Sequence, residues 1–153
     1  MDRKLSERLR KIADALPLKE GIRILEIGCG PGALAREICR RIKQGHVLGV
    51  DRSPKAIQQA IVNSETELKL GNLSFRQVAI EEFELDAGDK SFDMAVAVRV
   101  GALDGRHPTI EKLALEKIAK ALTPEGRLFI DGGDPLKEIS LEPYKVKAVS
   151  TAP

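Results

Sequence analysis

Short continuous apolar runs alternate along this chain with longer stretches in which apolar residues recur every three or four positions. A short apolar run without polar alternation is typical of a strand buried on both faces of a parallel sheet. Runs of this kind predict strands at residues 22–27, 46–51, 73–78, 92–98 and 127–131. A turn at residues 123–126, with proline and glycine in the positions that a type I turn favours, leads into the last strand.

The stretches between these runs have the spacing of amphipathic helices. A first helix precedes the first strand and ends at Pro17. Ser53 and Pro54 begin a later helix, because serine can cap a free N–H and proline suits the first helical position; that helix ends at Gly71. A short acidic helical turn follows the third strand at 81–83. The predicted inward-facing helix positions are Leu5, Leu9, Ile12, Leu16, Leu34, Ile38, Ile42, Ile57, Ala60, Ile61, Leu68, Ile110, Leu113, Ala114 or Leu115, Ile118 and Leu122.

Strands and helices alternate five times, which predicts an α/β fold with a doubly wound, mostly parallel, Rossmann-like sheet. We expect a single domain spanning residues 1–153. The tail is predicted to add one or two helical turns at 136–141 and a short antiparallel edge strand at 144–149. In such folds ligands bind outside the carboxyl ends of the strands, where the strand order reverses.

Composition narrows the class of protein. Hydrophobic residues make up 42% and charged residues 31% of the chain, as in globular proteins that fold in water. The net charge of +2 is no strong signal for nucleic acid, and no apolar run is long enough for a membrane span. No signal-peptide pattern follows Met1, so we expect a cytoplasmic location.

The two cysteines, Cys29 and Cys39, lie ten positions apart, with no histidine or cysteine at metal-ligand spacing. We therefore expect no metal site. Cys39 shares a helical face with Ala35 and Ile42, which predicts a small buried side chain. Nothing in the sequence indicates that either thiol is catalytic.

The most informative stretch is LEIGCGPG at residues 25–32, where a buried strand meets the start of a helix. Glycine has no Cβ, so it can adopt a positive φ in a tight turn and let a ligand approach the backbone. Asp51 ends the second strand about twenty residues later, where an acid that binds ribose hydroxyls is expected. Together the two signals predict a nucleotide-type cofactor. The alternative is that the glycines only make a tight strand-to-helix connection.

The same stretch indicates which cofactor is bound. Gly28, Gly30 and Ala33 also satisfy the spacing of a nicotinamide-dinucleotide fingerprint. However, Glu26 would repel a pyrophosphate and attract an ammonium group, and Pro31 removes one backbone N–H donor from the helix start. A ligand with a ribose, a cationic amino group and no phosphate fits better.

In these features the chain resembles the class I S-adenosylmethionine-dependent methyltransferases, particularly the small-molecule type with an E-x-G-x-G-x-G first motif. The resemblance runs from Ile22 to Gly132. Four segments match family motifs in the family's order. LEIGCGPG at 25–32 resembles the first motif, GVDRS at 49–53 the ribose-binding motif, DKSFD at 89–93 the entry to the fourth strand, and LTPEGRL at 122–128 the loop before the fifth.

The resemblance implies S-adenosyl-L-methionine as cofactor. It assigns Asp51 to both ribose hydroxyls, Glu26 to the amino group, and the backbone at Gly28 and Gly30 to the methionine moiety. The alternative role of Asp51 is to cap the helix that starts at Ser53. The full predicted cofactor-binding set is Glu26, Gly28, Cys29, Gly30, Gly32, Asp51, Arg52, Ile80, Glu81 and Arg99.

The chain departs from the family pattern around the adenine. Arg52 stands where the family often has an apolar residue, and its guanidinium can lie on the adenine ring. Ala79 stands where the family commonly has an aspartate near the adenine amino group. The Ile80 backbone and Glu81 are the substitutes, and the alternative for Glu81 is a plain solvated helix acid.

Methyl transfer is a direct displacement, in which the enzyme aligns the acceptor and excludes water. Residues 98–107 leave the fourth strand at the ligand-binding edge, where the acceptor is expected. Asp104 and His107 are the catalytic candidates, as bases for an acceptor that carries a proton; the alternative for His107 is to cap the next helix. The segment lacks the Asn-Pro-Pro-aromatic motif of members that act on amino groups of DNA or protein.

The family's usual sheet has seven strands, and this chain shows only five besides the strand expected in its tail. The shortfall leaves the acceptor pocket open to three interpretations: a large acceptor, a homodimer that lends surface, or a domain that binds cofactor without turnover. The predicted function is methyl transfer from S-adenosyl-L-methionine to a small-molecule acceptor. The alternatives are a nicotinamide-dinucleotide-dependent oxidoreductase and a non-catalytic cofactor-binding domain.

Overall fold

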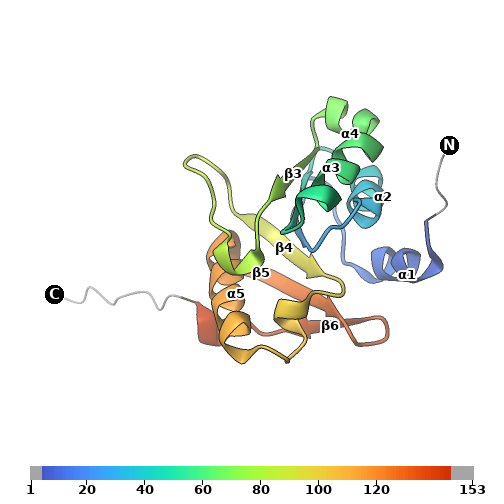
Figure 1. Ribbon diagram of the computed structural model, residues 1–153. Coiled ribbons are helices and arrows are strands. Elements are labelled where there is room, and N and C mark those ends of the chain that lie inside the picture. Colours follow the sequence, from blue (N-terminus) through green and yellow to red (C-terminus); the bar gives the residue numbers. More distant parts are fainter. Residues whose placement is uncertain (1–4, 146–153) are drawn as a thin grey trace.

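The protein is described by a computed structural model that covers residues 5–145. Within these residues six strands form one sheet in the order β3-β2-β1-β4-β5-β6 (Figure 1). The strands are β1 (Arg23–Ile27), β2 (His46–Asp51), β3 (Leu73–Gln77), β4 (Phe92–Ala97), β5 (Leu122–Asp131) and β6 (Leu136–Ile139). The first five are parallel and β6 is antiparallel to β5. The predicted doubly wound, mostly parallel α/β fold is confirmed.

Helices cover both faces of the sheet (Figure 1). They are α1 (Glu7–Ala15), α2 (Ala33–Arg41), α3 (Pro54–Asn63), α4 (Glu65–Leu70) and α5 (Pro108–Ala121), with short 3-10 turns η1 (Ile80–Glu82), η2 (Gly101–Leu103) and η3 (Glu142–Tyr144). Ser53 caps α3 as predicted, since its hydroxyl accepts the Ala56 N–H at 3.1 Å.

The hydrophobic core has two halves, one on each face of the sheet. Ile24 belongs to the half beneath α1 and α2, whereas Leu25 and Ile27 belong to the half beneath α5. Successive side chains of a strand point to opposite faces. Glu26 therefore lies on the same face as Ile24, beneath α2.

The single helix predicted between Ser53 and Gly71 is in fact two helices. The break falls at Ser64, whose buried hydroxyl accepts a hydrogen bond from the Arg36 guanidinium at 3.0 Å. The inward stripe of α3 is Ile57, Ala60 and Ser64, so the prediction that Ile61 faces inward is wrong: it is 47% exposed.

The predicted inward stripe of α5 is also too long. Ile110 and Leu113, in the first half of the helix, are largely exposed, while Ala114, Leu115 and Ile118 are buried. Only the later turns of α5 contribute to the core half beneath it, because its first turns reach past the carboxyl ends of the strands toward a cavity that Ile110 lines.

The tail differs from the prediction. Residues 136–139 form β6 and not helical turns, because the chain reverses after β5 and pairs with the otherwise free edge of that strand, with Asp131 opposite Leu136. An antiparallel edge strand is therefore present, but eight residues earlier than expected (136 against 144). Tyr144 lies in η3, and residues 146–149 of the expected strand lie outside the described residues.

The turn predicted at residues 123–126 lies within the bounds of β5, where the ladder with β4 is interrupted. Phe92 pairs with Leu122, and the next pair joins Met94 to Arg127. The four residues between Leu122 and Arg127 have no partner in that ladder. The predicted turn therefore forms an irregularity inside the strand.

Two isoleucines on α3 test this packing. We expect Ile57→Ala to lower the free energy of unfolding by at least about 2 kcal/mol, because it removes buried methyl groups and leaves a cavity. Ile61→Ala, one turn later, should change it by less than about 0.5 kcal/mol, because the side chain is already in water. Urea unfolding of both variants measures the difference, and equal losses would contradict the helix orientation.

Candidate active site

Backbone hydrogen bonds hold the loop after β1 against the end of β2. The N–H groups of Gly28 and Cys29 both donate to the Val50 carbonyl, at 2.8 and 3.0 Å. Gly28 has a φ of +70°, and a Cβ built there would lie 2.7 Å from the Val100 side chain. Only glycine fits this position without strain, which places the turn directly against the loop that follows β4.

The carboxylate of Asp51 joins the loop after β1 to the loop after β2 at the edge of the sheet. One of its oxygens accepts the Gly30 N–H at 2.9 Å, and the other accepts the Ser53 N–H at 2.9 Å. Each carboxylate oxygen can accept two hydrogen bonds, so acceptor capacity remains for a ligand. Asp51 thus both fixes the glycine turn and keeps room for further donors. The alternative role of Asp51 in capping α3 is not seen, because the cap of that helix is the Ser53 hydroxyl, while Asp51 accepts the N–H of the cap residue itself.

Glu26 is a buried carboxyl group without a full set of partners. The residue is 3% exposed, and its Oε1 has no hydrogen-bond partner in the described part of the chain. Burial raises its pKa to about 8; the Ala35 backbone hydrogen bond and the Arg36 charge oppose this rise, and the Asp51 charge adds to it. A buried acceptor with no donor is destabilising, which indicates a site that a ligand completes.

The two cysteines are buried and unpaired. Burial, with the charges of Glu26 and Asp51, raises the pKa of the Cys29 thiol far above its usual range, so it does not form a nucleophilic thiolate. Cys39 donates to the Asn72 side chain at 3.0 Å, beneath α2. Neither thiol has the properties of a catalytic group.

A cavity of about 500 Å³, called here the first cavity, opens at the carboxyl ends of β1, β2 and β4. The structure brings part of the predicted cofactor-binding set together in its lining, namely Gly28, Asp51, Arg52, Ile80, Glu81 and Arg99. The other four predicted residues, Glu26, Cys29, Gly30 and Gly32, do not line it. They lie in β1 and in the turn behind it, with Gly32 as the N-cap of α2.

A second cavity of about 650 Å³ adjoins the first, at the carboxyl ends of β4 and β5. The two cavities share Arg99, Val100, Gly101 and Arg106 as a common wall. The segment 98–107, expected from the sequence to meet the acceptor, therefore lines two adjoining spaces. Such an arrangement suits a reaction between two bound molecules.

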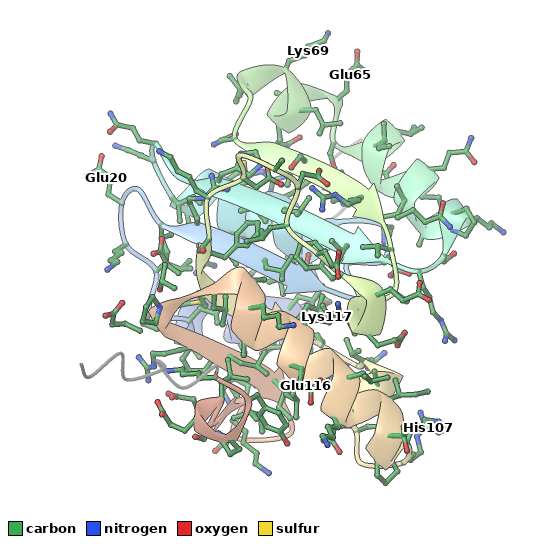
Figure 2. All side chains as sticks on the ribbon, turned by 90° about the vertical axis from the view of Figure 1, so that its left-hand side faces the viewer. Glu20, Glu65, Lys69, His107, Glu116 and Lys117 are labelled. Atoms are coloured by element: carbon green, nitrogen blue, oxygen red, sulfur yellow. The ribbon has the colours of Figure 1, made fainter. Side chains whose placement is uncertain are left out.

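The two candidate bases fall on different sides of this wall. Asp104 lines the second cavity and is paired with Arg106 at 2.6 Å, and its pKa is lowered chiefly by a hydrogen bond from the Arg106 backbone. A carboxylate held in this way is a weak proton acceptor. His107 lines the first cavity and is the N-cap residue of α5, and Figure 2 shows it at the N-terminal end of that helix. Its side chain makes no capping hydrogen bond.

Comparison with known proteins identifies the family. Residues 18–151 match the family model described as a methyltransferase domain. The chain belongs to the methyltransferase-domain family. It is 33% identical to the O-methyltransferase rstn1 of Aspergillus nomiae over 88% of this chain and 59% of that protein. It is 31% identical to the nocamycin O-methyltransferase of Saccharothrix syringae over 94% of this chain and 50% of that protein.

Solved structures give the same result for this methyltransferase domain. A phosphoethanolamine N-methyltransferase 2 of Haemonchus contortus, in complex with S-adenosyl-L-methionine, superposes with a TM-score of 0.65 at 25% identity, over 81% of this chain and 27% of that one. The chain spans about half the length of the curated relatives it matches, between 59% and 39% of the first three.

Four charged residues that line the cavities of this methyltransferase domain are absent from the sequence-based site predictions. They are Arg106, Glu111, Asp131 and Lys137. Asp131 ends β5 as Asp51 ends β2, so the acid at the end of a strand was a usable signal. Lys137 had no such signal, because β6 was not predicted.

Membrane spans and metal clusters are both absent from the described residues. No helix among them is long and apolar enough to cross a bilayer. No three His, Cys, Asp or Glu side chains in residues 5–145 are grouped so as to hold a metal ion.

The raised pKa of Glu26 predicts a pH dependence of stability. The folded protein holds this proton up to about pH 8, whereas the unfolded chain releases it near 4.5. Its stabilising contribution is therefore complete below 4.5 and is lost as the pH rises to 8. Because the glutamine of Glu26→Gln cannot ionise, we expect the Tm of this variant to rise relative to the wild-type Tm as the pH increases from 5 to 8. Tm curves that stay parallel over this range would contradict the assignment.

Proposed function

We propose that this domain transfers the methyl group of S-adenosyl-L-methionine to a small-molecule acceptor by direct displacement. The observation that carries the proposal is the juxtaposition of Glu26 and Asp51. One is a buried carboxyl group with an unpartnered oxygen, and the other is a partly exposed carboxylate that lines the first cavity. Both adjoin the same glycine turn.

Glu26 fits the cationic amino group of the methionine moiety. Without a bound cation, burial outweighs the charge of Arg36 and keeps this carboxyl group protonated at neutral pH. An ammonium group would supply both the missing donor and the missing charge, so that binding is coupled to release of the Glu26 proton. A pyrophosphate next to the same buried acid would be repelled, which disfavours the nicotinamide-dinucleotide alternative.

Asp51 fits the ribose. Its oxygens already accept the Gly30 and Ser53 N–H groups, which orient them, and their remaining capacity suits the two ribose hydroxyls. Arg52 and Glu81 line the same cavity and are proposed to contact the adenine together with the Ile80 backbone. Cys29, Gly30 and Gly32 are proposed to act through the backbone of the turn.

The bound cofactor supplies a methyl group on a sulfonium, which is a good leaving group. The chain's own contribution is to bind the two molecules, align them across residues 98–107 and exclude water. His107 and Asp104 are the two proposed candidates for a proton acceptor. His107 lines the first cavity and makes no capping hydrogen bond, whereas Asp104 lines the second cavity. Asp104 is the weaker base, since its contacts with Arg106 lower its pKa.

The relatives support the class of reaction. The two reported by sequence are O-methyltransferases, one of them named for nocamycin, and the solved neighbour is an N-methyltransferase. This favours a small molecule as acceptor without deciding between oxygen and nitrogen. The cytoplasmic location and the homodimer expected from the sequence stay predictions; two free cysteines are consistent with a reducing compartment.

Ligand-dependent melting tests the cofactor assignment. S-adenosylhomocysteine at a hundred times its Kd should stabilise the protein by about 2.7 kcal/mol, which corresponds to a rise in Tm of roughly 5–10 °C. NADH at the same concentration should leave Tm unchanged. Stabilisation by NADH alone would reverse the assignment. Incubation with methyl-labelled S-adenosyl-L-methionine and a metabolite extract should then give labelled product, and its absence would favour a non-catalytic cofactor-binding domain.

Asp51→Ala tests the ribose contact. Hydrogen bonds to a charged group are worth about 1.5–3 kcal/mol each, so we expect the Kd for S-adenosylhomocysteine to rise by roughly 10- to 150-fold. Asp86→Ala is the matched control, since Asp86 lies in a surface loop and its partner Arg76 also contacts Asp89. Titration calorimetry measures both, and an unchanged Kd for Asp51→Ala would remove this residue from the site.

A further inference from the structure

The second cavity is lined by both apolar and charged residues. Its apolar residues are Ala97, Leu103, Ile130 and Ile139, and its charged residues are Arg99, Asp104, Arg106, Glu111, Asp131 and Lys137. It lies on the far side of the Arg99 wall from the first cavity. Because the two cavities share lining residues, a molecule held in the second cavity adjoins one held in the first.

Most charges of the second cavity neutralise one another within the protein. Arg106 pairs with Asp104 at 2.6 Å, and Asp131 pairs with Arg8 of α1 at 2.5 Å. Among the described residues, the side chains of Arg99, Lys137 and Glu111 form no ion pair. Two cations and one anion of the cavity lining are therefore available to a ligand, and their net charge is positive.

The backbone of Arg99 is held in an unusual conformation. Its φ is +56°, a region that side chains other than glycine and asparagine rarely occupy. The Arg99 N–H donates to the Asp131 carboxylate at 3.0 Å, and the other oxygen of Asp131 accepts from Arg8. The acid at the end of β5 thus fixes the loop that follows the neighbouring strand β4.

A hydrogen bond of the same kind, from a loop N–H to a strand-end carboxylate, occurs at the first cavity. There the acid at the end of β2, Asp51, accepts the N–H of Gly30, whose φ is +53°, in the loop that follows the neighbouring strand β1. At the first cavity the residue so held is a glycine, whereas at the second it carries a guanidinium. Strained residues that the surrounding structure holds in place cluster at functional sites.

We propose that the second cavity binds the methyl acceptor and that this acceptor is a small carboxylate with an apolar body. The planar guanidinium of Arg99 matches a carboxylate, Lys137 adds a second positive charge, and the apolar residues receive the rest of the molecule. Asp131 is a positioning residue, which acts through the backbone of Arg99. The identity of the ligand as methyl acceptor rests on the proposed function, whereas the preference for a carboxylate does not.

Two probes of equal shape test the preference, namely 4-hydroxybenzoate and 4-hydroxybenzamide. Titration calorimetry at low salt, with saturating S-adenosylhomocysteine, should show the acid binding at least about tenfold more tightly than the amide. Arg99→Gln should abolish the difference between the acid and the amide. Equal binding of acid and amide by the wild type, or a preference that survives in Arg99→Gln, would overturn the proposal.

Control variants separate this role from a structural one. Arg10→Gln removes an exposed arginine of α1 that lines neither cavity, and it should keep the full preference. Arg99→Lys should keep part of it. Asp131→Asn retains an oxygen for the Arg99 N–H and should keep more of the preference than Asp131→Ala. If the two Asp131 variants behave alike, Asp131 does not position Arg99.

The failure of this proposal and that of the proposed function can be told apart. The two titrations are repeated without S-adenosylhomocysteine, which measures the preference for a carboxylate even if the protein does not bind the cofactor. A wild type that binds S-adenosylhomocysteine but treats acid and amide alike disproves the carboxylate site only. A wild type that prefers the acid but does not bind S-adenosylhomocysteine disproves the methyl-transfer proposal only.

Discussion

Desolvation of Glu26 is the constraint on which the site depends. A carboxyl group that is 3% exposed and lacks a donor for one oxygen destabilises the fold, and the apolar face beneath α2 raises its pKa to about 8. The sheet tolerates it because Glu26 lies on the central strand β1, between β2 and β4, where the surrounding core is complete. The carboxyl group that we propose as the partner of the cofactor's amino group thus lies at the centre of the fold.

A second recurrent device organises the ligand-binding edge. Asp51 and Asp131 each end a strand and each accept the N–H of a residue with positive φ in the loop after the neighbouring strand. In a parallel sheet the carboxyl ends of neighbouring strands meet at one edge, so a short side chain at the end of one strand reaches the next loop. The two carboxylates fix the loops of two adjoining cavities, which gives the edge one pocket on each side of Arg99.

Membership of the methyltransferase-domain family agrees with this geometry on the cofactor side of the edge. The relatives are longer, and the chain spans about half of their length. In the described residues β6 takes the position next to β5, and the second cavity is lined by one residue pair from β6, Lys137 and Ile139.

By itself the sequence determined the order of the elements, the parallel sheet, the glycine turn and the strand-end acid Asp51. These depend on local periodicity and on residues close together in the chain, whose physical consequences are short-ranged. Only the tertiary structure decided the break of the helix at Ser64, the exposure of Ile61, the β6 hairpin, and the roles of Arg106 and Asp131. Two of these depend on a partner distant in sequence, Arg36 for Ser64 and Arg8 for Asp131, and no local pattern records such a pairing.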